Sequence, residues 1–149
     1  MRTIQRDIVG AFIFSSDNQL LLGRGGVYAG NLVIPGGGID EGETPLDALR
    51  REVQEETGLD IADAQVEEIA LELTGASEKT LRDTGERVYV EMTFYNFKVT
   101  LDKPAAEIGL HTEDDFTDPV WVPIAKVGGV PLSPPTVTSL QAMGYLQET

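Results

Sequence analysis

The chain of 149 residues contains no cysteine and only one histidine. The lack of cysteine excludes disulfide bonds, zinc sites built on thiolates and enzymes that use a cysteine nucleophile. Cations are also scarce, because 11 Lys and Arg residues are outnumbered by 25 Asp and Glu residues, which gives a net charge of −14. Since nucleic-acid polymers and anionic membranes are bound mainly through Lys and Arg, this deficit argues against both as partners. It leaves open a nucleotide, whose phosphates a metal ion and one or two local cations can receive.

Long hydrophobic runs are missing as well. No apolar segment reaches membrane-spanning length, and Arg6 and Asp7 interrupt the apolar residues near the start, so we expect no secretory signal and a cytoplasmic location. The hydrophobic content of 41% and the charged content of 24% are ordinary for a globular protein. The length suits one domain, which we predict to span residues 1–149.

The clearest helix signal in the chain begins at Thr44. Thr44 can cap the N-terminus, and Pro45 suits the first helical position. Asp47 follows the cap by three residues, where a capping box places its acidic side chain. Gly58 supplies a left-handed residue that ends the helix, which predicts a helix from Pro45 to Thr57.

Three carboxylates share one side of this predicted helix. Glu52, Glu55 and Glu56 stand at positions i, i+3 and i+4, and they fall in the last turns, where the helix dipole disfavours negative charge. Like charges so placed cost a few tenths of a kcal/mol per pair. A divalent cation would make this arrangement a binding site, because Mg²⁺ and Mn²⁺ prefer hard oxygen ligands. The alternative is a solvated acidic face.

A run of three glycines, Gly36 to Gly38, precedes the helix by a short loop. Glycine lets the backbone approach a ligand closely, although a plain turn is the alternative interpretation. If the loop returns this backbone to the carboxylate face, the two segments together would form a pocket for a metal ion and a phosphate.

These residues match the signature of a known family, the Nudix box. The box has fixed glycine, glutamate, arginine and aliphatic positions at fixed spacing, which makes it a highly specific signal. This sequence fits at every fixed position: Gly37, Glu43, Arg51, Glu52, Val53, Glu55, Glu56, Gly58 and Leu59. The chain therefore resembles the Nudix hydrolases.

The resemblance implies an α/β/α sandwich with a mixed central sheet. It also implies hydrolysis of a nucleoside diphosphate linked to another group, with Mg²⁺, or alternatively Mn²⁺, as cofactor. A nucleoside triphosphate and a sugar nucleotide such as ADP-ribose remain open as substrates. Dimers are frequent among relatives, so a homodimer is a candidate assembly.

The resemblance also assigns roles to residues of the box. Glu52, Glu55 and Glu56 correspond to metal ligands, joined by the carbonyl of Gly36. Glu52 is the first choice for the general base, with Glu55 or an acid from a later loop as alternatives. Glu43 and Arg51 correspond to an ion pair that fixes the loop against the helix.

Three further residues are candidates outside the box. Arg24 follows a predicted strand, where relatives often contact the nucleotide, although a solvated loop cation is equally consistent. In many relatives a further acid precedes a strand that contains tryptophan, here marked by Trp121, and reaches the metal. Asp115 is our predicted ligand from this loop, and Glu113 is the alternative. The single histidine, His111, is expected to be an ordinary loop residue.

Two comparisons with the family pattern narrow the function. Relatives that remove 8-oxo-dGTP often read the base with an asparagine near the start of the last helix, and the segment SPPTVTSLQAM has none. Nudix domains that only sense a ligand usually have damaged boxes, whereas every ligand position is intact here. A non-catalytic nucleotide sensor is therefore the alternative function.

The remaining elements follow from apolar patterning. We expect a loop or hairpin tip over residues 74–87 and a closing helix over 136–147, capped by Ser133. The predicted strands cover residues 8–14, 19–22, 32–35, 66–73, 88–99 and 120–123.

Overall fold

The computed structural model describes residues 1–25, 30–71, 73–112 and 115–147. The helices are α1 (Pro45–Thr57) and α2 (Pro134–Ala142), with the 3₁₀ segments η1 (Ala105–Glu107) and η2 (Ile124–Gly129). The strands are β1 (Arg2–Phe14), β2 (Gln19–Arg24), β3 (Gly36–Gly38), β4 (Gln65–Glu68), β5 (Leu73–Thr80), β6 (Arg87–Thr100) and β7 (Thr117–Pro123).

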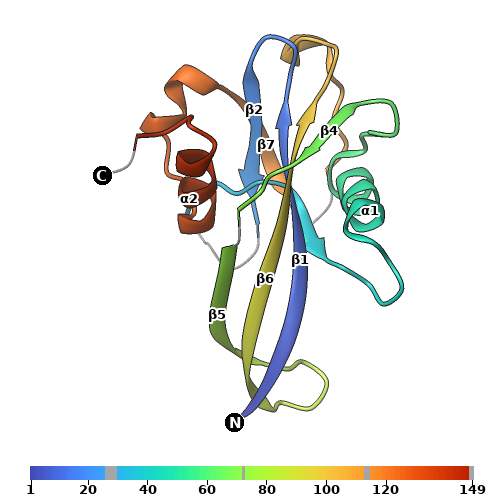
Figure 1. Cartoon of the computed structure of the whole chain (residues 1–149), viewed down its shortest axis with the longest axis vertical. Coiled ribbons are helices and arrows are strands. Elements are labelled where there is room, and N and C mark those ends of the chain that lie inside the picture. Colours follow the sequence, from blue (N-terminus) through green and yellow to red (C-terminus); the bar gives the residue numbers. More distant parts are fainter. Residues whose placement is uncertain (26–29, 72, 113–114, 148–149) are drawn as a thin grey trace.

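The strands form one mixed sheet that lies between the two α-helices (Figure 1). Its order is β4-β6-β1-β2-β7, while β3 pairs with β1 and β5 pairs with β6. β1 contacts both helix layers, and its residues 9–14 are all buried. Alternate side chains of a strand point to opposite faces. Val9, Ala11 and Ile13 accordingly pack with Leu49 and Val53 of α1.

The other face of β1 packs against the second helix. Phe12 and Phe14 lie in one cluster with Leu140 of α2 and with Leu20 and Leu22 of β2. A central strand buried on both faces needs apolar residues in succession, which the run from Val9 to Phe14 supplies. The predicted α/β/α sandwich with a mixed sheet is confirmed.

The pairings of β1 bring the glycine run into the sheet. β1 runs parallel to β6 over its whole length, from Arg2 opposite Val88 to Phe14 opposite Thr100. Its other edge pairs with β3 in antiparallel register, with Val9 opposite Gly37. The strand predicted over residues 32–35 is reduced to isolated bridges at Leu32 and Val33, and the strand itself is formed by the glycines.

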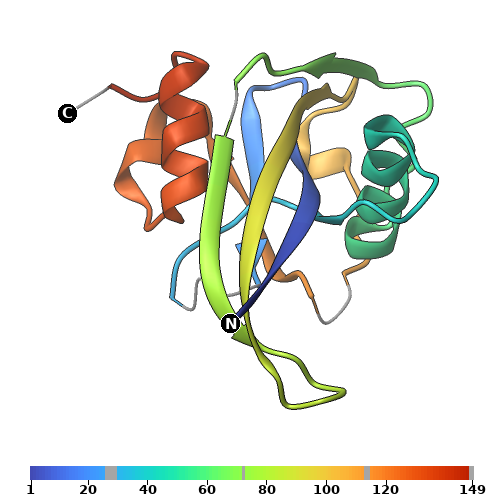
Figure 2. The ribbon, with the colours of Figure 1, turned by 60° about the horizontal axis from the view of Figure 1, so that its bottom comes forward.

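The segment from residue 74 to 87 differs most from the prediction. It was expected to be a loop or hairpin tip, and residues 81–86 do form the tip between β5 and β6. The first half is instead β5, which pairs with β6 from Leu73 opposite Phe94 to Thr80 opposite Arg87. Conversely, the strand expected over 66–73 is interrupted after Glu68. Polar residues form a strand here because β6 is long enough to offer its free edge. β5, β6 and the start of β1 make an arm that projects from the body (Figure 2).

The closing helix is shorter than predicted, since it runs from Pro134 to Ala142 and Gly144 follows with φ of 85°. It buries Thr136, Ser139 and Leu140, whereas Val137 is only half-buried. Two hydroxyl side chains thus face the protein interior.

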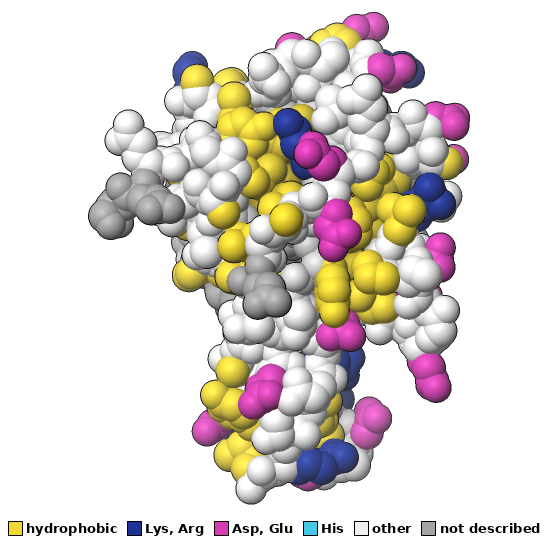
Figure 3. Space-filling view, viewed as in Figure 1, with side chains coloured by type: hydrophobic (Ala, Val, Ile, Leu, Met, Phe, Trp, Pro, Cys, Tyr) yellow, Lys and Arg dark blue, Asp and Glu magenta, His cyan; other side chains and the backbone are white. Residues whose placement is uncertain are grey.

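On the face shown in Figure 3, Asp and Glu side chains occur over both the body and the arm. Lys and Arg side chains lie among them as separate groups. The negative charge is therefore distributed over this face. Across the described residues, no helix has the length and apolar character needed to cross a membrane.

Candidate active site

Local interactions fix both ends of α1. The N–H of Asp47 donates to Oγ1 of Thr44 at 3.1 Å, and the N–H of Thr44 donates to Oδ2 of Asp47 at 3.3 Å. At the other end Gly58 is left-handed, with φ of 76°, and its N–H bonds to the carbonyl of Gln54. The predicted capping box and glycine stop are confirmed. Burial of Leu49 against the sheet then sets which side of the helix the acids occupy.

The structure brings the glycine strand against two of those acids. The N–H of Gly36 donates a 2.8 Å hydrogen bond to Oε1 of Glu56. A Cβ atom on Gly37 would lie 2.5 Å from the carboxyl carbon of Glu52, a contact that no real side chain makes. Any side chain at residue 37 would therefore force the carboxylate of Glu52 out of its observed position.

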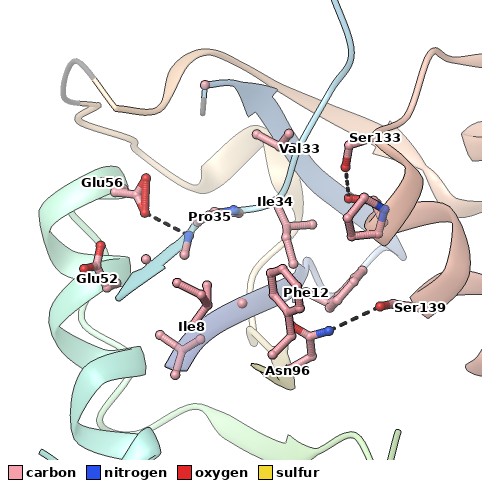
Figure 4. A pocket seen from close by; sticks show the side chains of 18 of the residues that line it. Ile8, Phe12, Val33, Ile34, Pro35, Glu52, Glu56, Asn96, Ser133 and Ser139 are labelled. Carbon is pink, nitrogen blue, oxygen red and sulfur yellow. Dashed lines mark hydrogen bonds between the residues drawn. The ribbon is translucent and has the colours of Figure 1, made fainter. Parts of the chain in front are cut away.

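A cavity of about 470 Å³ opens beside this contact. It extends from α1, across β3 and the middle of β1, to the start of α2 (Figure 4). Four predicted site residues line it: Gly36, Glu52, Glu56 and Asp115.

The other predicted site residues lie elsewhere. The side chain of Glu55 is 57% exposed and accepts a 3.3 Å bond from Arg51, so it does not line the cavity. Arg24 is exposed at the end of β2, although its neighbour Gly25 does line the cavity. Glu113, the alternative to Asp115, lies outside the described residues. His111 is a loop residue that docks on the end of α1, where its N–H bonds to the carbonyl of Thr57 at 2.8 Å.

Burial perturbs the acids that face the cavity. Glu56 is 6% exposed, and burial raises its pKa to about 8. The Gly36 N–H opposes this shift, whereas the charges of Glu52 and Asp115 add to it. Burial also raises the pKa of Glu52, against the hydrogen bond from Arg51. Burial, with a smaller contribution from the neighbouring acids, thus penalises the charged forms of Glu52 and Glu56.

The possible ligand atoms at this end of the cavity, from Gly36, Glu52, Glu56 and Asp115, suit a divalent cation. All of them are oxygen atoms, and the raised pKa of Glu56 shows that its negative charge is poorly compensated. Within the described ranges, however, no three His, Cys, Asp or Glu side chains already converge on one point. Without an ion, the site therefore consists of two carboxylates, those of Glu52 and Glu56, at the edge of the cavity.

Arg51 connects these acids to the preceding loop. Its Nε and Nη2 bond to the two carboxylate oxygens of Glu43 at 2.8 and 2.9 Å, and Nη2 also bonds to the carbonyl of Gly38 at 2.9 Å. Its Nη1 bonds to Glu52 at 2.9 Å. The Arg51 hydrogen bonds lower the pKa of Glu43 to about 2, helped by the N–H of Asp40. The predicted ion pair between Glu43 and Arg51 is present.

Sequence reasoning missed the polar residues at the far end of the cavity, which are Asn96, Ser133, Thr136 and Ser139. Asn96 could have been noticed, because it is a polar residue in the longest apolar strand pattern of the chain. The other three had no such signal. Ser133 was predicted only as the cap of the closing helix, and Thr136 and Ser139 lie in that helix, whose apolar residues were expected to face the sheet.

Several known proteins are similar to this chain in sequence or in fold. A nucleoside triphosphatase, NudI, from Enterobacter sp. is 28% identical over 95% of this chain and 99% of its own length. An RNA pyrophosphohydrolase from Bartonella bacilliformis is 42% identical, but the match covers only 34% of this chain and 35% of that protein. The solved structure of the E. coli dihydroneopterin triphosphate pyrophosphohydrolase superimposes with a TM-score of 0.72, at 17% identity, over 91% of this chain and 92% of that one.

The family model described as the NUDIX domain matches residues 4–140. This range contains every residue that we have placed at the cavity. The chain therefore belongs to the NUDIX domain family, which confirms the prediction of a hydrolase that acts on pyrophosphate bonds.

Proposed function

We propose that this protein hydrolyses the diphosphate linkage of a nucleoside diphosphate joined to another group, with a nucleoside triphosphate as the favoured substrate and a sugar nucleotide such as ADP-ribose as the alternative. One observation carries the proposal. The buried carboxylate of Glu56 and the half-buried carboxylate of Glu52 lie beside the Gly36–Gly38 backbone at one end of a cavity of nucleotide size. The full-length similarity to a nucleoside triphosphatase supports the triphosphate.

The proposed cofactor is Mg²⁺, with Mn²⁺ as an alternative. Glu52, Glu56, Asp115 and the carbonyl of Gly36 would hold it, and Glu55 would join them by leaving Arg51. A bound divalent ion would offset the negative charge of the substrate phosphates and favour ionisation of a water molecule. Among the described residues that line the cavity there is no Lys, Arg or His, so the protein itself supplies little charge to receive phosphate.

Glu52 is the proposed general base. Its raised pKa makes it a better proton acceptor than an exposed glutamate, and the 2.9 Å bond from Arg51 fixes its orientation. In the proposed reaction Glu52 takes a proton from water as the water oxygen bonds to phosphorus. The bond between that phosphorus and the bridging oxygen then breaks, and the bridging oxygen leaves with the second product. Glu55 and Asp115 remain the alternative bases.

A substrate panel with and without Mg²⁺ tests this function. The panel contains nucleoside triphosphates, ADP-ribose, a dinucleoside tetraphosphate and a 5′-triphosphorylated RNA oligonucleotide. We expect Mg²⁺-dependent release of a nucleoside monophosphate and pyrophosphate from a triphosphate. Turnover should fall by about 100- to 10,000-fold in Glu52→Gln. Glu67→Gln, which alters an exposed acid of β4, is the matched control and should leave turnover unchanged.

Absence of cleavage would support the alternative function. If no compound in the panel is cleaved while a nucleotide still binds by calorimetry, the chain is a non-catalytic nucleotide-sensing domain. Cleavage of the RNA oligonucleotide in preference to free nucleotides would instead contradict the expectation that no nucleic-acid polymer is bound. The predicted homodimer and cytoplasmic location stay predictions, and sedimentation velocity would measure the first.

A further inference from the structure

The far end of the cavity, beneath α2, is built differently from the carboxylate end. Asn96 of β6 lies there, 6% exposed, beside hydroxyl side chains that α2 contributes (Figure 4). The surrounding walls are apolar and include Ile8, Phe12, Ile34, Met92 and Phe94. A single neutral amide in an apolar recess is the arrangement by which small-molecule sites fix the orientation of a ligand.

The position of the Asn96 side chain is set by its neighbours on both sides. Its Nδ2 donates a 3.2 Å hydrogen bond to Oγ of Ser139. On the adjacent strand it faces Gly10, where an added Cβ would lie 2.4 Å from Oδ1 of Asn96. Gly10 therefore leaves the space that the amide occupies, and Ser139 fixes the direction in which it points.

The amide retains unused hydrogen-bonding capacity. Within the described part of the chain, Oδ1 of Asn96 accepts no hydrogen bond, and Nδ2 uses one of its two hydrogens. None of the fully enclosed side-chain nitrogen or oxygen atoms in this part lacks a partner. The free oxygen must therefore reach the cavity surface, where it and the second N–H present an acceptor next to a donor.

This end of the cavity suits an uncharged group. The first turn of α2 contains Pro134 and Pro135, which have no N–H, so this helix end is a poor site for an anion. The hydroxyls of Ser133 and Thr136 bond to each other at 2.7 Å. No cationic side chain lines this end among the described residues. A phosphate group bound beneath α2 would therefore have neither a positive side chain nor free backbone N–H groups as partners.

A nucleobase matches all of these features. Its two flat faces are apolar enough to pack between aliphatic and aromatic side chains, and its edge presents donors next to acceptors, as an amide does. The cavity volume of about 470 Å³ is in the lower half of the range for small-molecule sites, roughly 300–1,000 Å³. This volume suits one nucleoside with its phosphates and is small for two nucleosides.

We infer that Asn96 reads the edge of the substrate's nucleobase through Oδ1 and its free N–H, and that Ser139 is the positioning residue that holds this amide. The inference rests on the proposed function and narrows it to nucleotides whose base enters the recess between Ile34, Phe94 and α2. The phosphates then extend toward Glu52 and Glu56 at the opposite end of the same cavity.

The test compares Asn96→Leu and Ser139→Ala with Thr138→Ala. The control variant removes the exposed hydroxyl next to Ser139 on the same helix. The substrates are ATP, GTP, CTP, UTP and inorganic tripolyphosphate, which has no base. For Asn96→Leu we expect kcat/KM on the preferred nucleotide to fall about 10- to 100-fold, mainly through KM, and the preference among bases to disappear. Ser139→Ala should show a smaller loss of the same pattern, and tripolyphosphate hydrolysis should not change.

A binding measurement separates this inference from the proposed function. Without metal, nucleoside 5′-monophosphates should shift the side-chain NH₂ resonance of Asn96 in NMR spectra of the wild-type protein, and Ser139→Ala should weaken that binding. This shift in a protein that hydrolyses no nucleotide would support base reading while refuting the hydrolase. Unchanged base preference in folded Asn96→Leu, in a wild-type enzyme that does hydrolyse triphosphates, would refute base reading alone. If Asn96→Leu does not fold, the base preference and NH₂ shift of Ser139→Ala decide, and unchanged values overturn the inference.

Discussion

The backbone N–H of Gly36 donates a 2.8 Å hydrogen bond to Oε1 of Glu56, although the two residues are 20 positions apart in the chain. This bond joins the start of β3 to the last turns of α1 at the edge of the cavity. It satisfies one oxygen of a carboxylate that is otherwise buried, and yet the pKa of Glu56 is raised to about 8. The charged form of Glu56 thus needs a partner that the protein alone does not supply.

The stability of the metal-free protein should therefore depend on Glu56. Its pKa rises from 4.5 in the unfolded chain to about 8 on folding, so the folded state holds a proton that the unfolded state releases between these pH values. The associated stabilisation is complete below pH 4.5 and is lost as the pH rises to 8. Glu56→Gln removes this dependence, and at about 1.4 kcal/mol per pKa unit it should be more stable than wild type by a few kcal/mol at pH 8.

Urea unfolding in EDTA at pH 5 and pH 8 measures the effect. The control is Glu67→Gln, whose side chain is exposed on β4. If the free energies of unfolding of wild type and Glu56→Gln change in parallel between the two pH values, Glu56 is not held in its protonated form.

Glu43 should show the opposite pH dependence. Its pKa is lowered to about 2 by Arg51, so its stabilising effect is present above pH 4.5 and is lost as the pH falls through 2. Glu43→Gln should be less stable than wild type at pH 7 and equal to it near pH 2. Because Arg51 also bonds to Glu52, turnover should fall about 10- to 100-fold. Thermal unfolding across this pH range provides the measurement, with Glu41→Gln in the same loop as control. A constant difference at all pH values would contradict the ion-pair explanation.

Adjacent glycines of β3 provide a matched pair. In Gly37→Ala the new Cβ would lie 2.5–2.6 Å from the carboxylate atoms of Glu52, whereas a Cβ on Gly38 would meet nothing within 4 Å. Displacing Glu52 by this contact should lower turnover by about 100-fold, while Gly38→Ala should remain close to wild type. Steady-state kinetics on the best substrate decides the matter, after circular dichroism has shown that both variants fold. Equal activities would mean that the exact position of Glu52 does not limit turnover.

Divalent-cation binding should require both Glu52 and Glu56. We expect Mg²⁺ and Mn²⁺ to raise the melting temperature of the wild-type protein, because a ligand bound only to the folded state stabilises it. Glu52→Gln and Glu56→Gln should each weaken binding about 10- to 100-fold by calorimetry. Glu91→Gln, on the arm, is the control. A comparable loss in Glu55→Gln would show that Glu55 leaves Arg51 to join the site. Undiminished affinity in both Glu52→Gln and Glu56→Gln would place the cation elsewhere.

Whether a helix or strand was predicted correctly depends on how far apart in the chain the residues that determine it lie. For α1 the cap, the box acid and the glycine stop act on their immediate neighbours, and the helix has the predicted bounds. For β5 the polar sequence indicated a loop, and the free edge of β6 made it a strand. The closing helix was predicted to continue to Gln147, but Gly144 follows it in a left-handed conformation and the helix ends at Ala142.

The order of residues along the chain was enough to establish the family, the helix that carries the carboxylates and the presence of the Arg51–Glu43 pair, because fixed spacing within one loop and helix specifies them. The packing of the folded chain is needed to know that Glu56 is buried against Gly36 while Glu55 turns outward to Arg51. The same packing brings Asn96 and Ser139, which are 43 positions apart, together at the other end of the cavity. These contacts depend on how separate strands and helices pack, and residue spacing within one segment does not specify that packing.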